Sequence, residues 1–287
     1  MSADDAQAPA WIFGEVPEPD ELAVALYLDG ADPVEPVAPA LQLWYDLIAG
    51  LVVPAFTPPG VTPKVVLYGR EGVHGRGPTV RAKRWQDGLN DRLWWWSATW
   101  SYEIPEPYQP YEIQCRLHRL RERRHVRLRL FVSSPSGTQH MLLPAVLEVL
   151  RRFGDAADPA YGELTVRDHA PDSCTKLDGV LRLLDTTSAD ASRAQLRGYE
   201  WATVIPAELT ARLGGVDALR ATGAFVEVTA LATGGVLARA TEHPQEYTAD
   251  RAEQVFAALL PVLPPPDPDW PACTDWRLIV PRPARAW

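Results

Sequence analysis

The sequence predicts an α+β protein in two layers, with mostly antiparallel sheets and helices packed on one side. Strand-like runs that alternate apolar and polar residues follow one another directly, as at residues 113–120 and 126–132. Helix-like runs, with apolar residues spaced by three and four, occur singly between groups of strands. The strict strand–helix–strand alternation of a parallel fold is missing, which favours α+β.

The first third of the chain contains the elements of one α+β part. The run ELAVALYL at 21–28 predicts a strand, and residues 37–51 predict a helix. A strand is expected at 64–68, a second helix at 79–93 and an aromatic strand at 94–104.

The middle of the chain predicts a hairpin followed by a helix. Residues 113–120 and 126–132 are expected to pair as antiparallel strands, with the turn at RERR, 121–124. A helix is expected from about 138 to 153 and a short strand at 161–166.

The C-terminal part begins with the stretch LRGYEWATVIPAELTARLGG at 196–215. It predicts a strand, a turn at Pro206 and a short helix, which the Gly214-Gly215 pair ends because glycine adopts left-handed backbone angles without strain. The later predictions are a helix at 216–221, a hairpin of 225–230 with 235–240, and a helix at 248–260 with Thr248 as N-cap.

Composition favours a folded, acidic protein. The chain has 287 residues, is 46% hydrophobic and carries a formal net charge of -9. That charge argues against a nucleic-acid or anionic-membrane binder and suits a basic partner or a basic substrate. The predicted organisation is a loose acidic tail (1–20), an N-terminal α+β part (21–110), a C-terminal α+β part packed on it (111–264) and a proline-rich tail (265–287).

The compartment predicted from the sequence is the cytoplasm. Three cysteines, Cys115, Cys174 and Cys273, are odd in number and widely spaced, as in reduced proteins. The N-terminus lacks the basic and apolar regions of a secretory signal. The longest apolar run, 47–56, is shorter than the ~20 residues of a membrane helix, so no membrane association is expected.

No catalytic residue, cofactor or metal site is predicted. The loop GREGVHGRG at 69–77 offers glycines and arginines to an anion but lacks the P-loop ending, and a plain connecting loop is the alternative. Cys115 and His118 have a metal-like spacing, yet on a strand an odd separation directs them to opposite faces. A second group of potential ligands has no partner pair at zinc-like spacing: Asp168, His169, Asp172 and Cys174.

The predicted hairpin concentrates arginines in an otherwise acidic chain. Arg116, Arg127 and Arg129 are expected on its outward face, and its tip holds Arg121, Arg123 and Arg124. A solvated face, or a rim for an acidic partner, is favoured over a phosphate-binding ribbon, because no aromatic or amide groups that read bases accompany the arginines.

The aromatic strand offers a second candidate binding surface. Trp94, Trp96 and Trp100 could form a platform for a ligand or partner, because Trp and Arg dominate binding hot spots. Core filling is the favoured alternative, since alternate residues of the strand should face the core.

The C-terminal motif carries a family resemblance. Its members are Gly198, Trp201, Pro206, Leu213, Gly214 and Gly215. With the hairpin at 226–240, the final helix and the run DPAYGEL at 158–164, residues 155–264 resemble the type VI secretion immunity-like proteins of the polymorphic-toxin immunity group. Ile205-Pro206 departs from the glycine or oxygen-rich turn usual there.

The resemblance implies a non-catalytic bacterial protein that binds and neutralises a cognate toxin, and its motif transfers no catalytic residue. An enzyme with a site assembled from dispersed groups, or a structural component of a bacterial assembly, remains as an alternative. Oligomeric state is left open.

Overall fold

The molecule is organised around one antiparallel sheet. The computed structural model describes residues 20–29, 38–57, 60–71, 79–82, 93–102, 111–119, 125–134, 139–166, 175, 177–178 and 185–264. The strands are β1 (Asp20–Asp29), β2 (Lys64–Glu71), β3 (Thr79–Ala82), β4 (Leu93–Tyr102), β5 (Tyr111–Arg119), β6 (His125–Ser134), β7 (Tyr161–Val166), β8 (Ala202–Ile205), β9 (Glu227–Ala230) and β10 (Val236–Arg239).

These strands form a 10-stranded sheet in the order β3-β2-β4-β5-β6-β1-β7-β8-β10-β9. Every neighbouring pair is antiparallel. The predicted α+β class with antiparallel pairing is therefore confirmed. β1 lies between β6 and β7, so one continuous sheet runs through both of the parts that the sequence predicts.

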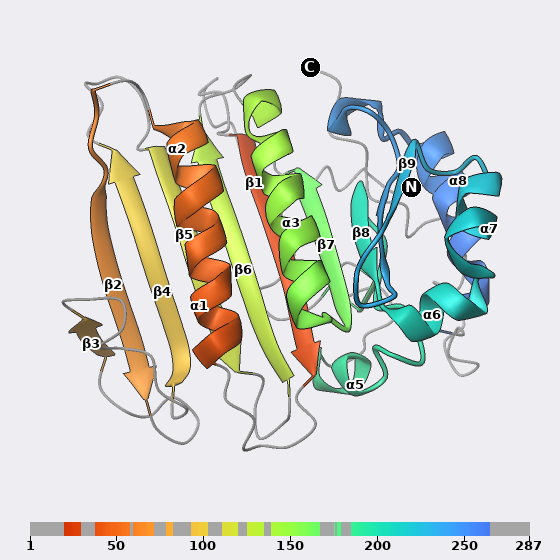
Figure 1. Ribbon diagram of the computed structural model, residues 1–287, viewed down its shortest axis with the longest axis horizontal. Helices are drawn as coiled ribbons and strands as arrows, with labels where there is room; N and C mark the ends of the chain where they lie inside the picture. The colour runs from red at the N-terminus through yellow and green to blue at the C-terminus, as the bar shows by residue number, and fades with distance from the viewer. Residues whose placement is uncertain are drawn as a thin grey trace, which may run out of the picture.

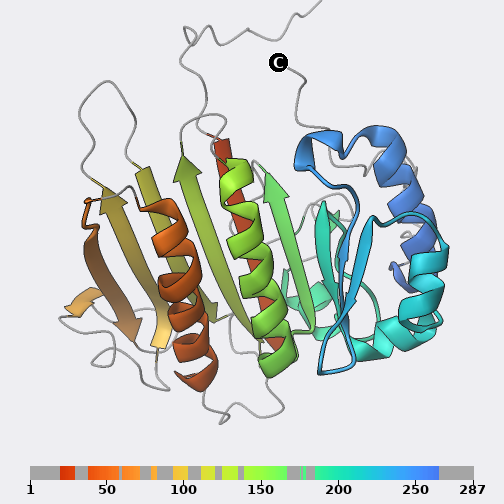
Figure 2. The same ribbon diagram turned by 45° about the horizontal axis from the view of Figure 1, so that its top comes forward.

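Two long helical segments cover one face of this sheet (Figure 1). The turned view of Figure 2 shows both on the same side, with the short C-terminal helices gathered around β8–β10. The α-helices are α1 (Ala38–Leu47), α2 (Val53–Phe56), α3 (Leu143–Ala157), α5 (Asp185–Asp190), α6 (Ala207–Arg212), α7 (Gly215–Ala221) and α8 (Ala249–Leu259). A π-helical segment, η1 (Ile48–Val52), joins α1 to α2, and 3-10 turns occupy Gln139–Met141, Pro244–Glu246 and Leu260–Val262.

The prediction of a helix at 79–93 is wrong at both ends of that range. Thr79–Ala82 forms β3, which pairs with Leu67–Arg70 of β2, and Leu93 already belongs to β4. Sheet pairing overrides the helical spacing of apolar residues here, and Thr79 and Val80 are β-branched residues that suit a strand. Residues 83–92 lie outside the described part of the chain.

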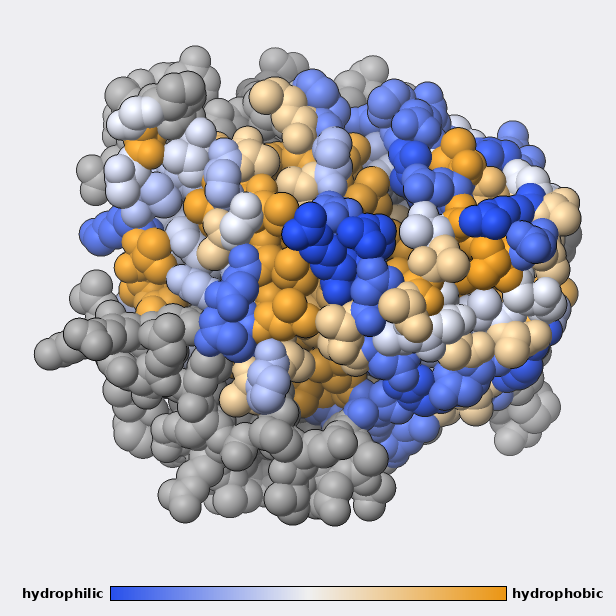
Figure 3. All heavy atoms as spheres, in the orientation of Figure 1, coloured by the Kyte–Doolittle hydropathy of each residue, from blue (hydrophilic) through white to orange (hydrophobic). Residues whose placement is uncertain are grey.

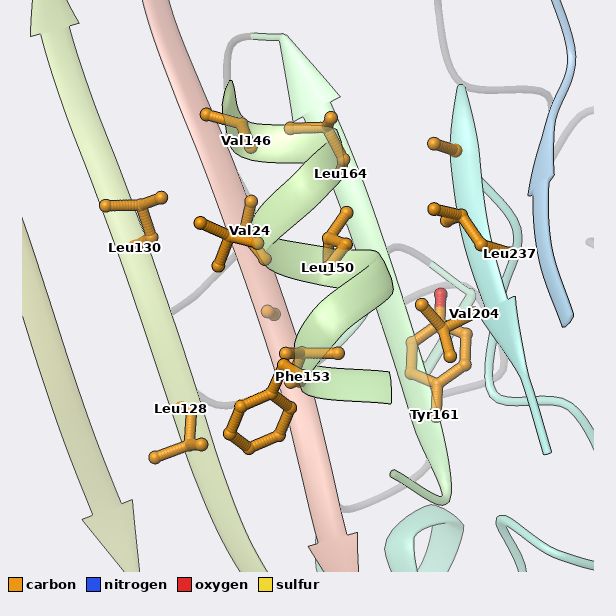
Figure 4. Close-up of a cluster of buried hydrophobic side chains, with 14 of the residues drawn as sticks. Val24, Leu128, Leu130, Val146, Leu150, Phe153, Tyr161, Leu164, Val204 and Leu237 are labelled. Carbon is orange, nitrogen blue, oxygen red and sulfur yellow. The ribbon is translucent and has the colours of Figure 1, made fainter. Parts of the chain in front are cut away.

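The main core lies between the sheet and the helices. Figure 4 shows Leu130 of β6, Val24 of β1 and Leu164 of β7 facing Val146 and Leu150 of α3. All five side chains are at most 1% exposed. Burial of such side chains contributes about 1.5–3 kcal/mol each, so this layer holds α3 on the sheet.

The C-terminal motif forms as predicted. Pro206 precedes α6, and Gly214 follows it with φ of 86°, in the left-handed region. Gly215 has φ of 85° and begins α7. Thr248 occupies the predicted N-cap position of α8, but its side chain makes no capping hydrogen bond.

Candidate functional site

The face of the sheet away from α1 and α3, called the second face below, carries the arginines of the β5–β6 hairpin. Arg127 is 4% exposed and Arg129 is 6% exposed, whereas the sequence predicted a solvated outward face. The prediction that these side chains share one face is confirmed. The prediction that this face is exposed to solvent is wrong, because alternation of apolar and polar residues does not reveal whether a polar face is buried. Arg116 is half-buried, and the tip residues Arg121, Arg123 and Arg124 lie outside the described residues.

The strand register brings these cationic groups side by side. Arg116 of β5 is paired with Arg129 of β6, and His118 is paired with Arg127. The guanidinium carbons of Arg116 and Arg129 lie 5.0 and 4.2 Å from the centre of the Phe131 ring, where both make cation–π contacts. We call Arg116, His118, Arg127 and Arg129 the arginine block.

A buried polar cluster adjoins the arginine block across β1. Tyr27 of β1 is paired with Arg127 on one side and with Tyr161 of β7 on the other. The Arg197 guanidinium lies 4.0 Å from the centre of the Tyr27 ring and donates to Asp178 Oδ2 at 2.7 Å. Both side chains of this ion pair are 1% exposed, so its geometry is fixed by the surrounding structure.

Carboxylates and hydroxyls complete the cluster. Tyr161 donates its hydroxyl to Glu163 Oε2 at 2.7 Å, and Arg197 Nε donates to Ser188 Oγ at 3.0 Å. Burial raises the pKa of Tyr161 well above its usual value, and the Glu163 charge raises it further. Burial also raises the pKa of Tyr27, against the opposing effect of Arg197 and Arg127. Both tyrosines are therefore neutral phenols at pH 7, able to donate hydrogen bonds but not to act as bases.

Sequence reasoning did not find this cluster. Its members come from two strands and from the segment between β7 and β8, and they share no sequence motif: Tyr27, Tyr161, Glu163, Asp178, Ser188 and Arg197. The available signal was the polar residue Glu163 at an alternate position of a predicted strand that otherwise reads as buried.

Trp96 and Trp100 of β4 lie under the helices. Trp96 is 0% exposed and Trp100 is 3% exposed, and Tyr45 of α1 contacts both rings, with centroid distances of 6.2 and 5.3 Å. This burial fits the core-filling alternative and leaves neither side chain on the surface. Trp94 belongs to the same strand.

The suggested ligands Cys115 and His118 diverge as the alternation predicts. Cys115 is 0% exposed within the hydrophobic core, and burial raises the pKa of its thiol. His118 belongs to the arginine block on the second face. Within the described part of the chain, no group of three or more His, Cys, Asp or Glu residues is placed to hold a metal ion. The group at 168–174, and most of the loop at 69–77, lie outside that part.

The C-terminal motif has a packing role. Trp201 is 2% exposed, and its indole Nε1 donates to the Thr241 carbonyl and hydroxyl at 3.1 and 3.0 Å. A Cβ atom on Gly198 would lie 2.8 Å from the Tyr161 hydroxyl, so the motif glycine leaves room for the buried cluster. Gly198 of the motif thus packs directly against the buried cluster on the second face.

The helix-covered side exposes an apolar surface. Figure 3 shows hydrophobic side chains over α1 and between α1 and α3, beside a hydrophilic group on α3. The partly buried side chains Leu43, Leu47, Leu51 and Leu147 contribute to it. Ala38–Phe56 is 19 residues long and apolar enough, by length and composition, to cross a membrane, and 28% of its apolar 18-residue window is buried. A core helix passes the same test, so this is weak evidence for a span.

Several exposed carboxylates belong to the C-terminal elements, and one of them, Asp217, is paired with the exposed Arg220. The side chains of Asp217, Glu227 and Glu242 are 96%, 52% and 59% exposed. Arg239 lies 2.9 Å from Glu227 and 3.2 Å from Glu242. Its side chain is 15% exposed, so its guanidinium is less accessible to solvent than the two carboxylates are. With the exposed residues Glu246 and Asp250, we call these five carboxylates the acidic end.

Comparisons with known proteins show a fold relationship. No family model matches the chain, and no curated protein matches its sequence. Among solved structures, the chain is similar to the Pseudomonas aeruginosa T6SS protein PA0821, with a TM-score of 0.52 and 15% sequence identity. The likeness covers 85% of this chain and 76% of that one. At this identity it shows a shared fold.

Proposed function

We propose that this chain is a non-catalytic interaction protein of immunity type, which binds a basic effector and neutralises it in the cytoplasm. The observation that carries the proposal is the fold shared with a T6SS protein over 85% of the chain. The resemblance of residues 155–264 to immunity-like proteins points the same way.

Charge supports a basic protein partner. The net charge of -9 and the acidic end give an exposed negative field, which accelerates encounter with a basic surface. Arg116, Arg127 and Arg129 of the hairpin are half-buried or buried, so these three guanidiniums are poorly displayed to a polyanion such as nucleic acid. The acidic end is therefore the surface that we assign to the first encounter with the effector.

The first experiment identifies the partner. The tagged protein is expressed in its native host, captured and analysed by mass spectrometry, and each candidate effector gene is then expressed with and without this protein. We expect capture of a toxic protein encoded beside this gene and restored growth on co-expression. Growth that stays arrested, with the protein present in excess, would refute neutralisation and favour an enzyme or a structural component.

The second experiment locates the encounter surface. The triple variant Glu242→Lys, Glu246→Lys and Asp250→Lys reverses charge at the acidic end, and Asp46→Lys makes the same kind of change on the exposed side of α1. We expect the triple variant to slow association by at least about tenfold at low salt, the lower limit for electrostatic steering. Asp46→Lys should slow it less. Equal rates for both variants would rule out the acidic end as the encounter surface.

A further inference from the structure

An apolar strip covers the outward side of the helical segment from α1 to α2 (Figure 3). Asp46 is the one charged residue in the sequence at 38–57. Its side chain is exposed, and so are Gly50 and Pro54, one and two turns further along. The half-buried side chains beside them are Leu43, Leu47 and Leu51. We call these residues together the apolar strip, and exposed apolar surface of this kind is typical of an interaction site.

The opposite side of the same segment holds it on the sheet. Its core-facing side chains are at most 1% exposed: Leu41, Trp44, Ile48 and Val52. Insertion of the segment into a bilayer would remove these side chains from the core, and the net charge of -9 is repelled by anionic headgroups. The strip therefore suits a protein partner that binds while the segment stays in place.

α3 lies beside α1 and places basic side chains at the level of Asp46. The rings of Trp44 and Phe153 are in contact, with a centroid distance of 5.3 Å. Figure 1 shows that the two helices run in opposite directions, since α1 leads up to α2 whereas α3 leads down to the start of β7. Because both helices rise equally per residue, Asp46, two residues after Trp44, is level with Arg151, two residues before Phe153.

Arg151 has donors available for a further carboxylate. Three of its N–H groups donate to Glu148 and Asp155, each at 2.8 Å. A guanidinium carries five N–H donors, so two of them have no acceptor among the described residues. The side chain is 38% exposed, which leaves it accessible to a partner.

We propose that this surface binds a second copy of this chain, with α1 of each copy against α3 of the other. A two-fold axis parallel to the helices and between them makes the same contact twice. It places Asp46 of each copy opposite the partner's Arg151, so that two pairs of opposite charge form beside the apolar strip. A dimer that pairs α1 with α1 would instead bring the two Asp46 carboxylates together, because Asp46 lies near the middle of the segment.

The size of the surface predicts a weak dimer. The 19 residues of Ala38–Phe56 extend about 28 Å at ~1.5 Å per residue, and two helices side by side are about 20 Å wide. That footprint of roughly 500 Å² per copy is smaller than the ~800 Å² of a standard interface, so we expect dimerisation at micromolar concentrations.

The dimer goes beyond effector binding and does not depend on it. The dimer contact belongs to α1 and α3, whereas the acidic end belongs to the C-terminal elements, and the experiment uses no effector. Either assignment can therefore fail while the other holds.

The test measures the mass of the full chain by sedimentation equilibrium between about 1 and 300 μM, the range of a weak interface. We expect the mass to rise from that of one chain to that of two and to stop there, because a two-fold contact closes on itself. A protein that remains monomeric throughout, or that forms larger assemblies, would overturn the proposal.

Two charge reversals and their mixture test the contact itself. Asp46→Arg places an arginine opposite the partner's Arg151, and Arg151→Asp places two aspartates opposite one another, so each variant alone should dimerise at least about tenfold more weakly. An equimolar mixture of the two variants restores both pairs of opposite charge and should associate about as tightly as the wild type. This recovery also shows that both variants fold. A mixture that associates no more tightly than its components would refute the contact.

Two further samples complete the test. Asp217→Arg makes the same charge change at a side chain 96% exposed on α7, and it should leave dimerisation unchanged. If Arg151→Asp does not fold, Arg151→Gln takes its place, and its mixture with Asp46→Arg should be tighter than Asp46→Arg alone. Binding to phosphatidylcholine vesicles at concentrations where the protein is monomeric would assign the strip to a membrane and overturn the dimer.

Discussion

Both faces of this sheet bury side chains around β1 and β6, but the buried side chains on the two faces are of opposite kinds. The face beneath α1 and α3 is aliphatic and aromatic, with Trp96, Ile113 and Leu130 all 0% exposed. The second face contains Tyr27, Arg127, Arg129 and Glu163, each less than 9% exposed. The sheet thus has an apolar core on one face and buried charged, hydrogen-bonded side chains on the other.

The difference shows which physical forces hold each layer. On the helix-covered face, stability follows from apolar area and packing density, and it changes gradually with side-chain volume. On the second face, each charge depends on a particular partner, so loss of one group leaves another buried and unpaired. The second face should therefore respond more sharply to single substitutions and should be rescued by paired ones.

The largest effect is expected from Asp178→Ala. Removal of this carboxylate breaks the ion pair of Asp178 with the Arg197 guanidinium, in which both side chains are 1% exposed. The free energy of unfolding should fall by about 3–5 kcal/mol, as for other broken buried pairs. Urea denaturation at pH 7 measures the change.

The double variant Asp178→Ala with Arg197→Met provides the control. Removal of both members leaves no guanidinium that has lost the Asp178 carboxylate, so the double variant should be more stable than Asp178→Ala alone. If the two single effects simply add, the pair does not act as a unit, and the contrast between the two faces fails.

On the helix-covered face, Leu130→Ala is the matching change. Leu130 is 0% exposed and faces α3, so its truncation leaves a cavity between sheet and helix. We expect a loss of about 3 kcal/mol in the free energy of unfolding. A second truncation on the facing helix, Val146→Ala, should produce no rescue, because cavities have no charge to compensate. Recovery of stability in that double variant would contradict the distinction between the two faces of the sheet.

Sequence patterns predicted features that depend on residues close in sequence and missed those that depend on the tertiary arrangement. Alternation placed Arg116, Arg127 and Arg129 on one face, and the spacing of Gly214 and Gly215 predicted the end of α6. Neither pattern reveals which strands far apart in the sequence pair, so the position of β1 between β6 and β7 was not predicted. The link from Asp178 to Arg197 depends on that tertiary arrangement, as does the burial of Arg127.

A smaller loss of stability is expected from Gly198→Ala, which lies next to the buried cluster. The added Cβ would lie 2.8 Å from the Tyr161 hydroxyl, which is itself held by Glu163. The displacement should cost about 1–3 kcal/mol, as overpacking does. Gly50→Ala in η1 is the control: nothing lies within 4 Å of its added Cβ, and it should be neutral or slightly stabilising. Equal effects at both glycines, measured by thermal unfolding, would show that Gly198 is not constrained by the cluster.

The smallest effect is expected outside both faces, in the exposed ion pairs of α3. Glu148 accepts hydrogen bonds from Arg151 and Arg152, and these bonds lower its pKa from 4.5 to about 2. Because the folded-state pKa is the lower one, the stabilising contribution is present above pH 4.5 and is lost as the pH falls towards 2. The side chains are 31%, 38% and 52% exposed, so solvent screens the pairs.

Glu148→Gln should therefore lower the free energy of unfolding by no more than about 0.5 kcal/mol at pH 7, as for other surface ion pairs. The difference between the urea midpoints of the wild type and the variant should shrink between pH 7 and pH 3, and added salt should reduce it at pH 7. The corresponding loss in Asp178→Ala should respond little to salt, because that pair is shielded from solvent. A salt-insensitive loss in Glu148→Gln, as large as that of Asp178→Ala, would show that exposure does not separate the two kinds of ion pair in this protein.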